Sequence, residues 1–106
     1  MCKIKYLNKI LKKLPPDERK LLVKNVNKLR NKIESCETSF DMIFNNDSIK
    51  YDKYENNFYA VRFHGKISMR VLYRFENDTI EVHMVYFKHE YGSDYIRKFR
   101  EYSFKH

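Results

Sequence analysis

The stretch FYAVRFHGKISMRVLYRFENDTIEVHMVYF, residues 58–87, decides the fold of this chain. Apolar and polar residues alternate along three runs of it, and a period of two is the pattern of a strand that buries one face. The runs are Phe58–His64, Ile67–Phe75 and Ile80–Phe87, separated by Gly, Asn and Asp residues that favour tight turns. In the third run, one face holds Ile80, Val82, Met84 and Tyr86. The stretch therefore predicts an antiparallel meander of three strands with one apolar face.

The apolar face of the meander needs a cover, and the residues before it supply one. Apolar residues recur at helical spacing over Ile4–Leu14 and again over Leu22–Ile33, with lysines and asparagines on the other faces. The Pro-Pro-Asp step at residues 15–17 ends the first helix and opens the second, because proline is tolerated in a first turn. We expect a helical hairpin over residues 1–36 that packs on the sheet.

The remaining segments complete a single domain over residues 1–106. Residues 37–57 lack a clear period and are expected to form a variable connection with at most one short element. The sheet and a C-terminal tail occupy residues 58–106, and Tyr95–Phe104 has the spacing of a short helix. The predicted fold class is therefore α+β, with an N-terminal helical hairpin packed on a small antiparallel sheet and a short C-terminal helix.

The composition is that of a folded domain without a membrane segment. Hydrophobic residues make up 42% and charged residues 34% of the 106 residues, which suits one domain with a modest core. No apolar run approaches the roughly 18–20 residues of a membrane span, and the basic N-terminal segment lacks the cleavage site of a signal peptide. Cys2 and Cys36 are too few for a disulfide framework and lack metal-ligand spacing. We expect a cytoplasmic protein with no metal, no cofactor and no membrane partner.

Positive charge is concentrated in the N-terminal third of the chain. The formal net charge is +8, and residues 1–33 hold eleven basic and two acidic side chains. A basic region of this kind on a small domain favours a polyanion or an acidic protein as partner. The alternative is a solvated, lysine-rich helix face that binds nothing.

Three arginines share the predicted polar face of the meander. Arg62, Arg70 and Arg74 alternate with apolar residues, so all three point away from the apolar face. A guanidinium group suits phosphate because it presents paired donors and keeps its charge. Glu81 could pair with one of them across the strands, as on an ordinary solvated surface, but three arginines exceed the carboxylates expected nearby. The pattern indicates a polyanion site on an open sheet face.

The segment after the third strand, YFKHEYGSDY at residues 86–95, gathers groups that could carry chemistry. His89 could transfer a proton near neutral pH, and Lys88 is a cation beside it. Tyr91 and Tyr95 could stack on bases or donate hydrogen bonds. The alternative is a strand-to-helix corner whose tyrosines cap the core. The remaining histidines of the strand region are interpreted as surface residues without a role: His64 and His83.

These segments, in this order, resemble the RelE/ParE superfamily of toxins from type II toxin–antitoxin modules. The corner LPPDER at residues 14–19 is similar to the family's interhelical turn, and MRVLYR at residues 69–74 is similar to its arginine-centred strand. FKHEY at residues 87–91, continued to Tyr95, resembles the closing strand and tail of the family's ribosome-dependent nucleases, in particular the HigB branch. The family begins with a strand before its first helix, which only residues 1–5 could supply here.

The resemblance implies an mRNA endonuclease that cleaves on the ribosome and inhibits translation. In that reaction a 2′-hydroxyl attacks the adjacent phosphate and leaves a cyclic phosphate and a 5′-hydroxyl end. Carried over to this sequence, Arg70 stabilises the phosphate charge and Tyr95 stacks on or orients the nucleotide. His89 transfers a proton, and Lys88 assists it. Further contacts with the RNA are expected from five residues: Arg62, Lys66, Arg74, Tyr91 and Arg97.

The same resemblance implies particular partners. They are a cognate antitoxin protein, in a toxin–antitoxin hetero-oligomer, together with the ribosome and mRNA. Two alternatives stay open. One is a ParE-like toxin that shares the fold but inhibits DNA gyrase and cleaves nothing, and the other is a non-catalytic module that binds nucleic acid or protein.

Overall fold

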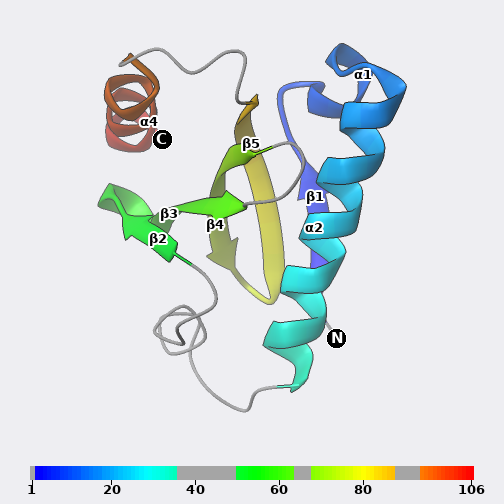
Figure 1. The fold of residues 1–106 in the computed structure, drawn as a ribbon. Helices are drawn as coiled ribbons and strands as arrows, with labels where there is room; N and C mark the ends of the chain where they lie inside the picture. The colour runs from blue at the N-terminus through cyan, green and yellow to red at the C-terminus, as the bar shows by residue number, and fades with distance from the viewer. Residues whose placement is uncertain (1, 36–49, 64–67, 88–93) are drawn as a thin grey trace.

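The computed structural model of the protein describes residues 2–35, 50–63, 68–87 and 94–106. It has the predicted α+β class, with a helix near the N-terminus, a sheet, and a short helix at the C-terminus (Figure 1). In chain order the elements are β1 (Lys3–Tyr6), α1 (Ile10–Lys13), α2 (Pro16–Ser35), β2 (Lys50–Lys53), the 3₁₀ turn η1 (Glu55–Asn57), β3 (Phe58–Phe63), β4 (Met69–Glu76), β5 (Thr79–Phe87) and α4 (Asp94–Lys105). No helix within these described ranges is long and apolar enough to cross a membrane.

The sheet has five strands in the order β1-β5-β4-β3-β2. Its centre is the predicted meander, because β3, β4 and β5 pair antiparallel, and β2 adds a fourth antiparallel strand beside β3. The hairpin between β4 and β5 closes at Asn77 and Asp78, whose positive φ angles of 52° and 56° fit a two-residue type I′ turn. Because β1 pairs with β5 in parallel, the sheet is mixed, which corrects the purely antiparallel sheet predicted above.

The segment predicted as the first helix forms two elements instead. Lys3–Tyr6 is the strand β1, and α1 is a single helical turn over Ile10–Lys13. Asn8 and Lys9 between them have positive φ angles of 58° and 56°, a left-handed conformation that a continuous α-helix does not contain. Pairing with β5 gives the backbone N–H and C=O groups of β1 hydrogen-bond partners, so these residues form a strand. The prediction of a helical hairpin over residues 1–36 is thus wrong at Lys3–Tyr6, which form a strand.

Helix α2 covers one face of the sheet. It begins at Pro16, as predicted, and Asp17 and Glu18 lie near the positive end of its dipole. Its buried side chains are spaced along one side and belong to the larger core, which holds Leu22, Val26 and Leu29 of α2 together with Tyr59, Val61, Met69, Val71, Tyr73, Ile80, Val82 and Phe87 of the sheet. Each fully buried side chain of this size contributes about 1.5–3 kcal/mol, so this core is the main source of stability.

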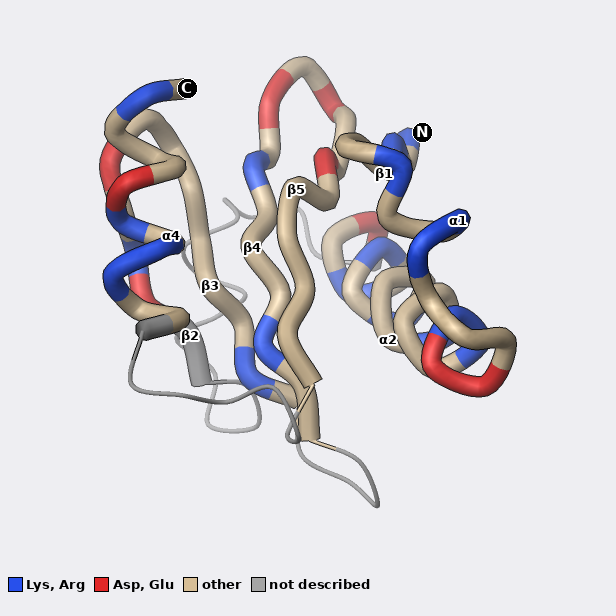
Figure 2. Tube along the Cα trace, turned by 90° about the horizontal axis from the view of Figure 1, so that it is seen from above, with Lys and Arg blue, Asp and Glu red and all other residues tan. Residues whose placement is uncertain are grey.

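Helix α4 covers the opposite face, so the sheet lies between two helices (Figures 1 and 2). A second, smaller core joins Phe99 of α4 to Phe58, Ala60 and Leu72 of β3 and β4, and all four side chains are buried. The sheet face that carries the arginines is therefore not open, contrary to the prediction. A helix with an apolar side has to bury that side, and this face of the sheet is where α4 does so.

A bulge in β5 changes the face that its residues point to. Tyr73 pairs with Val82 and Leu72 pairs with Met84, so His83 has no opposite residue in β4. Because side chains alternate along a strand, one extra residue inverts the phase of everything after it.

The residues after the bulge accordingly occupy the faces opposite to those predicted. Val85 and Phe87 pack in the α2 core with Val82, whereas Met84 and Tyr86 pack on the α4 side. The prediction that Met84 and Tyr86 share the face of Val82 is wrong.

Candidate nucleic-acid interface

The arginines that the sequence singles out lie on the α4 side of the sheet. Arg62 of β3 and Arg70 of β4 are opposite one another in the strand register, and Arg74 lies further along β4. Side chains in opposite positions approach to about 5 Å at their Cβ atoms, and like charges held so close are destabilising on their own. The groups that surround each guanidinium therefore decide what these arginines can do.

Arg70 contacts Tyr95, and this pair brings two of the predicted catalytic residues together. The Arg70 Nε–H donates to the Tyr95 hydroxyl oxygen (3.4 Å), and the guanidinium carbon lies 5.8 Å from the centre of the tyrosine ring. Tyr95 belongs to the first turn of α4, and its ring meets Phe99 edge to face at 5.8 Å. Both members of the pair are half-buried, so helix α4 holds a phenol directly over the sheet arginine.

Arg62 is paired with a carboxylate that the sequence analysis did not consider. Its Nη2 donates to Asp52 Oδ2 at 2.9 Å, and this hydrogen bond raises the pKa of Arg62 above its ordinary value. Asp52 belongs to β2, a strand within the segment that was predicted to be a variable connection. From the sequence, we expected more arginines than nearby carboxylates to pair with them. That expectation is wrong for Arg62, because Asp52 is its partner.

Arg74 makes several contacts within the protein. Its Nε donates to Glu81 Oε1 (2.8 Å), its Nη1 donates to the carbonyl oxygen of His106 (2.9 Å), and its guanidinium lies 5.0 Å from the centre of the Phe58 ring. These contacts join β4 to β5 and to His106, the residue that follows α4. A part for Arg74 in RNA binding stays a prediction.

The other predicted site residues divide into two groups. Arg97 is exposed on α4, where its Nη1 donates to Glu101 Oε1 at 3.1 Å, a pair one helical turn apart. The remaining four lie outside the described residues: Lys66, Lys88, His89 and Tyr91.

His83 has a role that the sequence analysis missed, because it was interpreted as a surface residue. Its side chain is only 3% exposed. Nδ1 lies 2.8 Å from the Tyr102 hydroxyl, and Nε2 lies 3.1 Å from Glu81 Oε1. The β5 bulge turns this ring under α4, and a one-residue bulge leaves no mark in a pattern of alternating residues.

The hydrogen bonds around His83 fix the direction of each donor. Asn8 Nδ2 donates to the Tyr102 hydroxyl oxygen (3.1 Å) and to the His83 carbonyl (3.1 Å). The phenol hydrogen is then available to His83 Nδ1, and the hydrogen on Nε2 points to Glu81. The chain of donors runs from Asn8 through Tyr102 and His83 to Glu81.

Burial determines the protonation of this cluster. It lowers the pKa of His83 below the ordinary value, and the hydrogen bond and charge of Glu81 offset this only in part. For Glu81, burial raises the pKa, but hydrogen bonds from His83 and Arg74 outweigh burial, so the pKa is lowered overall. At neutral pH the imidazole is uncharged and the carboxylate is ionised, which suits a cluster that binds α4 to the sheet.

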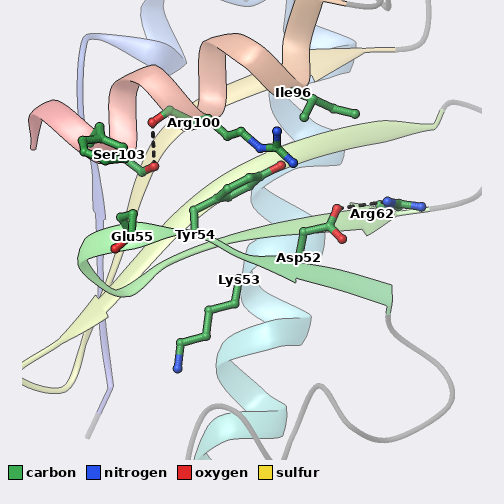
Figure 3. Close-up of a pocket in the computed structure, with 9 residues that line it drawn as sticks. Asp52, Lys53, Tyr54, Glu55, Arg62, Ile96, Arg100 and Ser103 are labelled. Atoms are coloured by element: carbon green, nitrogen blue, oxygen red, sulfur yellow. Dashed lines mark hydrogen bonds and ion pairs between the residues drawn. The ribbon is translucent and has the colours of Figure 1, made fainter.

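An open cleft of about 930 Å³ lies between α4 and the segment from β2 to η1 (Figure 3). One wall comes from Asp52, Tyr54 and Arg62, and the other from Ile96 and Arg100 of α4. Its volume is in the range of clefts that hold small ligands. Within the described part of the chain, no group of three or more His, Cys, Asp and Glu side chains could hold a metal ion.

Comparison with known proteins gives no relative from which a function could be transferred. No protein-family model matches the chain, and neither a curated protein nor a solved structure shows significant similarity to it. The function is therefore argued from the residues and their geometry.

Proposed function

We propose that this protein is a toxin of a type II toxin–antitoxin system that cleaves mRNA on the ribosome. The observation that carries the proposal is the contact of Arg70 with Tyr95, a cation and an aromatic ring at the covered face of the sheet. Support comes also from the order of elements, in which β1 precedes the helices and the meander follows them. This order is the one implied by the resemblance to the RelE/ParE superfamily.

The proposed reaction breaks one P–O bond of the RNA backbone. The 2′-hydroxyl loses its proton and attacks the adjacent phosphorus, and the bond to the 5′ oxygen breaks as that oxygen takes up a proton. The products are a cyclic phosphate and a 5′-hydroxyl end. Such a reaction needs a cation at the phosphate and groups that move the two protons.

Arg70 is the group proposed to stabilise charge on the phosphate. A guanidinium–phosphate contact has a charge on both partners and is stronger than the contact of Arg70 with the Tyr95 hydroxyl. When RNA binds, the phosphate replaces the phenol at the guanidinium, and the Tyr95 ring is free to stack on a base. His89, assisted by Lys88, is proposed to transfer protons.

The proposed partners follow from the same reading of the fold. The ribosome presents the mRNA, and the basic side chains of α1 and α2 contact ribosomal RNA. A cognate antitoxin binds the toxin in a hetero-oligomer and keeps it inactive.

The test is to map the 5′ ends of cellular transcripts after brief induction of the protein. We expect new ends in phase with codons for the wild type and for Lys98→Gln, which removes an exposed charge from α4 at a side chain that contacts the Tyr86 ring and has no proposed role. Arg70→Ala is expected to reduce them by about 10²–10³-fold, the usual effect of removing a group that stabilises transition-state charge. His89→Ala is expected to reduce them by about 10²–10⁴-fold.

Other outcomes would identify another function. Growth arrest without new transcript ends, together with loss of gyrase supercoiling activity, would contradict the nuclease and favour the ParE-like alternative. Neither arrest nor cleavage would favour a non-catalytic binding module.

A further inference from the structure

The cleft beside α4 is lined by direct neighbours of the Arg70–Tyr95 pair. Arg62, which lines the cleft, is the cross-strand neighbour of Arg70. The Tyr54 ring, also in the cleft wall, meets Phe99 edge to face at 6.4 Å, and Tyr95 meets Phe99 from its own side. The cleft therefore starts one strand away from Arg70, next to the position proposed for the bound phosphate.

Arg100 supplies a positive charge to this cleft. Its side chain points toward the Tyr54 hydroxyl from the α4 wall, and no carboxylate of the described residues forms an ion pair with it (Figure 3). Arg62, by contrast, is neutralised by Asp52 at 2.9 Å. Burial raises the pKa of Tyr54, so its hydroxyl stays protonated and can donate a hydrogen bond beside Arg100. Lys53 also lines the cleft, but its side chain points away from Tyr54 and Arg100, and its Nζ lies 5.6 Å from the centre of the Tyr59 ring (Figure 3).

The cleft also carries exposed apolar side chains. Among the described residues, the large hydrophobic side chains that remain exposed are Ile96, at 36%, and Phe104, at 75%. Both line this cleft, on the same wall as Arg100. A flat ring next to an arginine is the combination with which proteins bind single-stranded nucleic acid, because bases stack on rings and phosphates pair with cations.

We propose that this cleft binds a nucleotide of single-stranded RNA next to the one held at Arg70, with its base on Phe104 and its phosphate at Arg100 and the Tyr54 hydroxyl. The inference deepens the proposed function and rests on it for the path of the RNA. The cleft selects a single strand, because a base inside a duplex offers no free face for stacking.

The experiment measures binding of a fluorescein-labelled, fully 2′-O-methylated RNA heptamer, which cannot be cleaved, by fluorescence anisotropy at low salt. We expect Phe104→Ala to weaken binding by about 5- to 150-fold, the usual effect of losing one stacked base. Phe104→Trp is expected to restore it. Arg100→Gln is expected to weaken binding by about tenfold or more. The matched control is Lys98→Gln, which removes the same charge from the same helix at a side chain that contacts Tyr86 outside the cleft.

The results separate this inference from the proposed function. The cleft is not an RNA site if Arg100→Gln and Phe104→Ala bind the heptamer as tightly as Lys98→Gln does, or if the wild type shows no saturable binding. Neither result would change the transcript ends expected for the wild type and Arg70→Ala, so the proposed nuclease would still stand. If the wild type cleaves no transcripts, the nuclease proposal fails, while a selective loss of binding in the two cleft variants would still establish RNA binding there.

Discussion

His83 shows how much one side chain contributes to the arrangement of the site. Its two ring nitrogens connect Glu81 of β5 with Tyr102 of α4, and Asn8 joins the same cluster from the turn after β1. A buried imidazole requires such partners, because an unpaired polar group inside a protein costs about 1–3 kcal/mol. The cluster sets the position of α4, and hence of Tyr95 over Arg70.

The depressed pKa of His83 makes the stability of the fold depend on pH. The unfolded chain, with an ordinary histidine pKa of about 6.5, binds a proton more readily than the native state. The contribution of the uncharged His83 to the free energy of unfolding is therefore complete above about pH 6.5. It is lost as the pH falls through the lower pKa that His83 has in the native state. The groups that face the ring are Glu81, Arg74, Tyr102 and His106.

We expect the free energy of unfolding in urea to fall between pH 6.5 and pH 5 for the wild type. His83→Gln should flatten this slope, since the titrating group is gone. His106→Gln removes an exposed imidazole stacked on Tyr102 and should leave the pH dependence of the free energy of unfolding as steep as in the wild type. An equal slope in the wild type and His83→Gln would contradict the assigned protonation.

At the scale of the elements, periodicity in the sequence predicted the parts that alternate without interruption. The three strands of the meander and helix α2 were predictable, because each repeats its own period over several residues. Strand β1 was not predictable, because the spacing of Ile4, Leu7 and Ile10 fits a helix. Only its pairing with β5 makes residues 3–6 a strand. The β5 bulge keeps alternation on both of its sides and is therefore invisible in the pattern.

The candidate site was predictable only in part, for a related reason. The sequence singles out Arg70 in a predicted strand and Tyr95 in the C-terminal tail, and the structure brings the two side chains into contact. Asp52 and Tyr54 belong to an aperiodic segment, so nothing in the sequence related them to Arg62 or to α4. The apolar spacing of Tyr95, Phe99 and Tyr102 was the available indication that α4 has to cover a face of the sheet.

Phe99 is the buried residue by which α4 packs on the sheet, and this gives a prediction at the same scale. Its side chain is fully buried, so Phe99→Ala should lower the free energy of unfolding by about 3–5 kcal/mol. Phe104→Ala removes the same ring from an exposed position of the same helix and should change it by less than about 0.5 kcal/mol. Urea unfolding followed by far-UV circular dichroism measures both, since the chain has no tryptophan. Equal effects would mean that α4 is not held by this core.

For the whole molecule, the positive charge is divided between two opposite sides. Helix α2 exposes Lys20, Lys24 and Lys28 at a spacing of four, away from its buried side chains, while Arg70 and Arg100 lie on the α4 side of the sheet. A short RNA bound at the proposed sites contacts one side only. A ribosome can contact both.

The salt dependence of binding should separate the two sides. For single strands, the slope of log K against log salt concentration is about −0.7 for each phosphate contact, so Arg100→Gln should make the heptamer slope less steep by about 0.7. Replacing Lys20, Lys24 and Lys28 with glutamine should leave the heptamer slope unchanged and reduce the slope measured with ribosomes. A change in the heptamer slope with the triple variant would contradict the division of charge.

The parallel pairing of β1 with β5 has a consequence for the order of events during synthesis. Lys3–Tyr6 leaves the ribosome more than seventy residues before its partner, Thr79–Val82. The edge of the sheet therefore stays incomplete until residues 79–82 have been made, and contacts between such distant segments form slowly. Tyr95 and the rest of α4 follow later still, so a nascent chain carries Arg70 well before it carries the tyrosine that pairs with it. The proposed nuclease would thus gain its assembled centre only after Tyr95 and α4 have been made, and until then the proposed antitoxin could meet a chain that is still inactive.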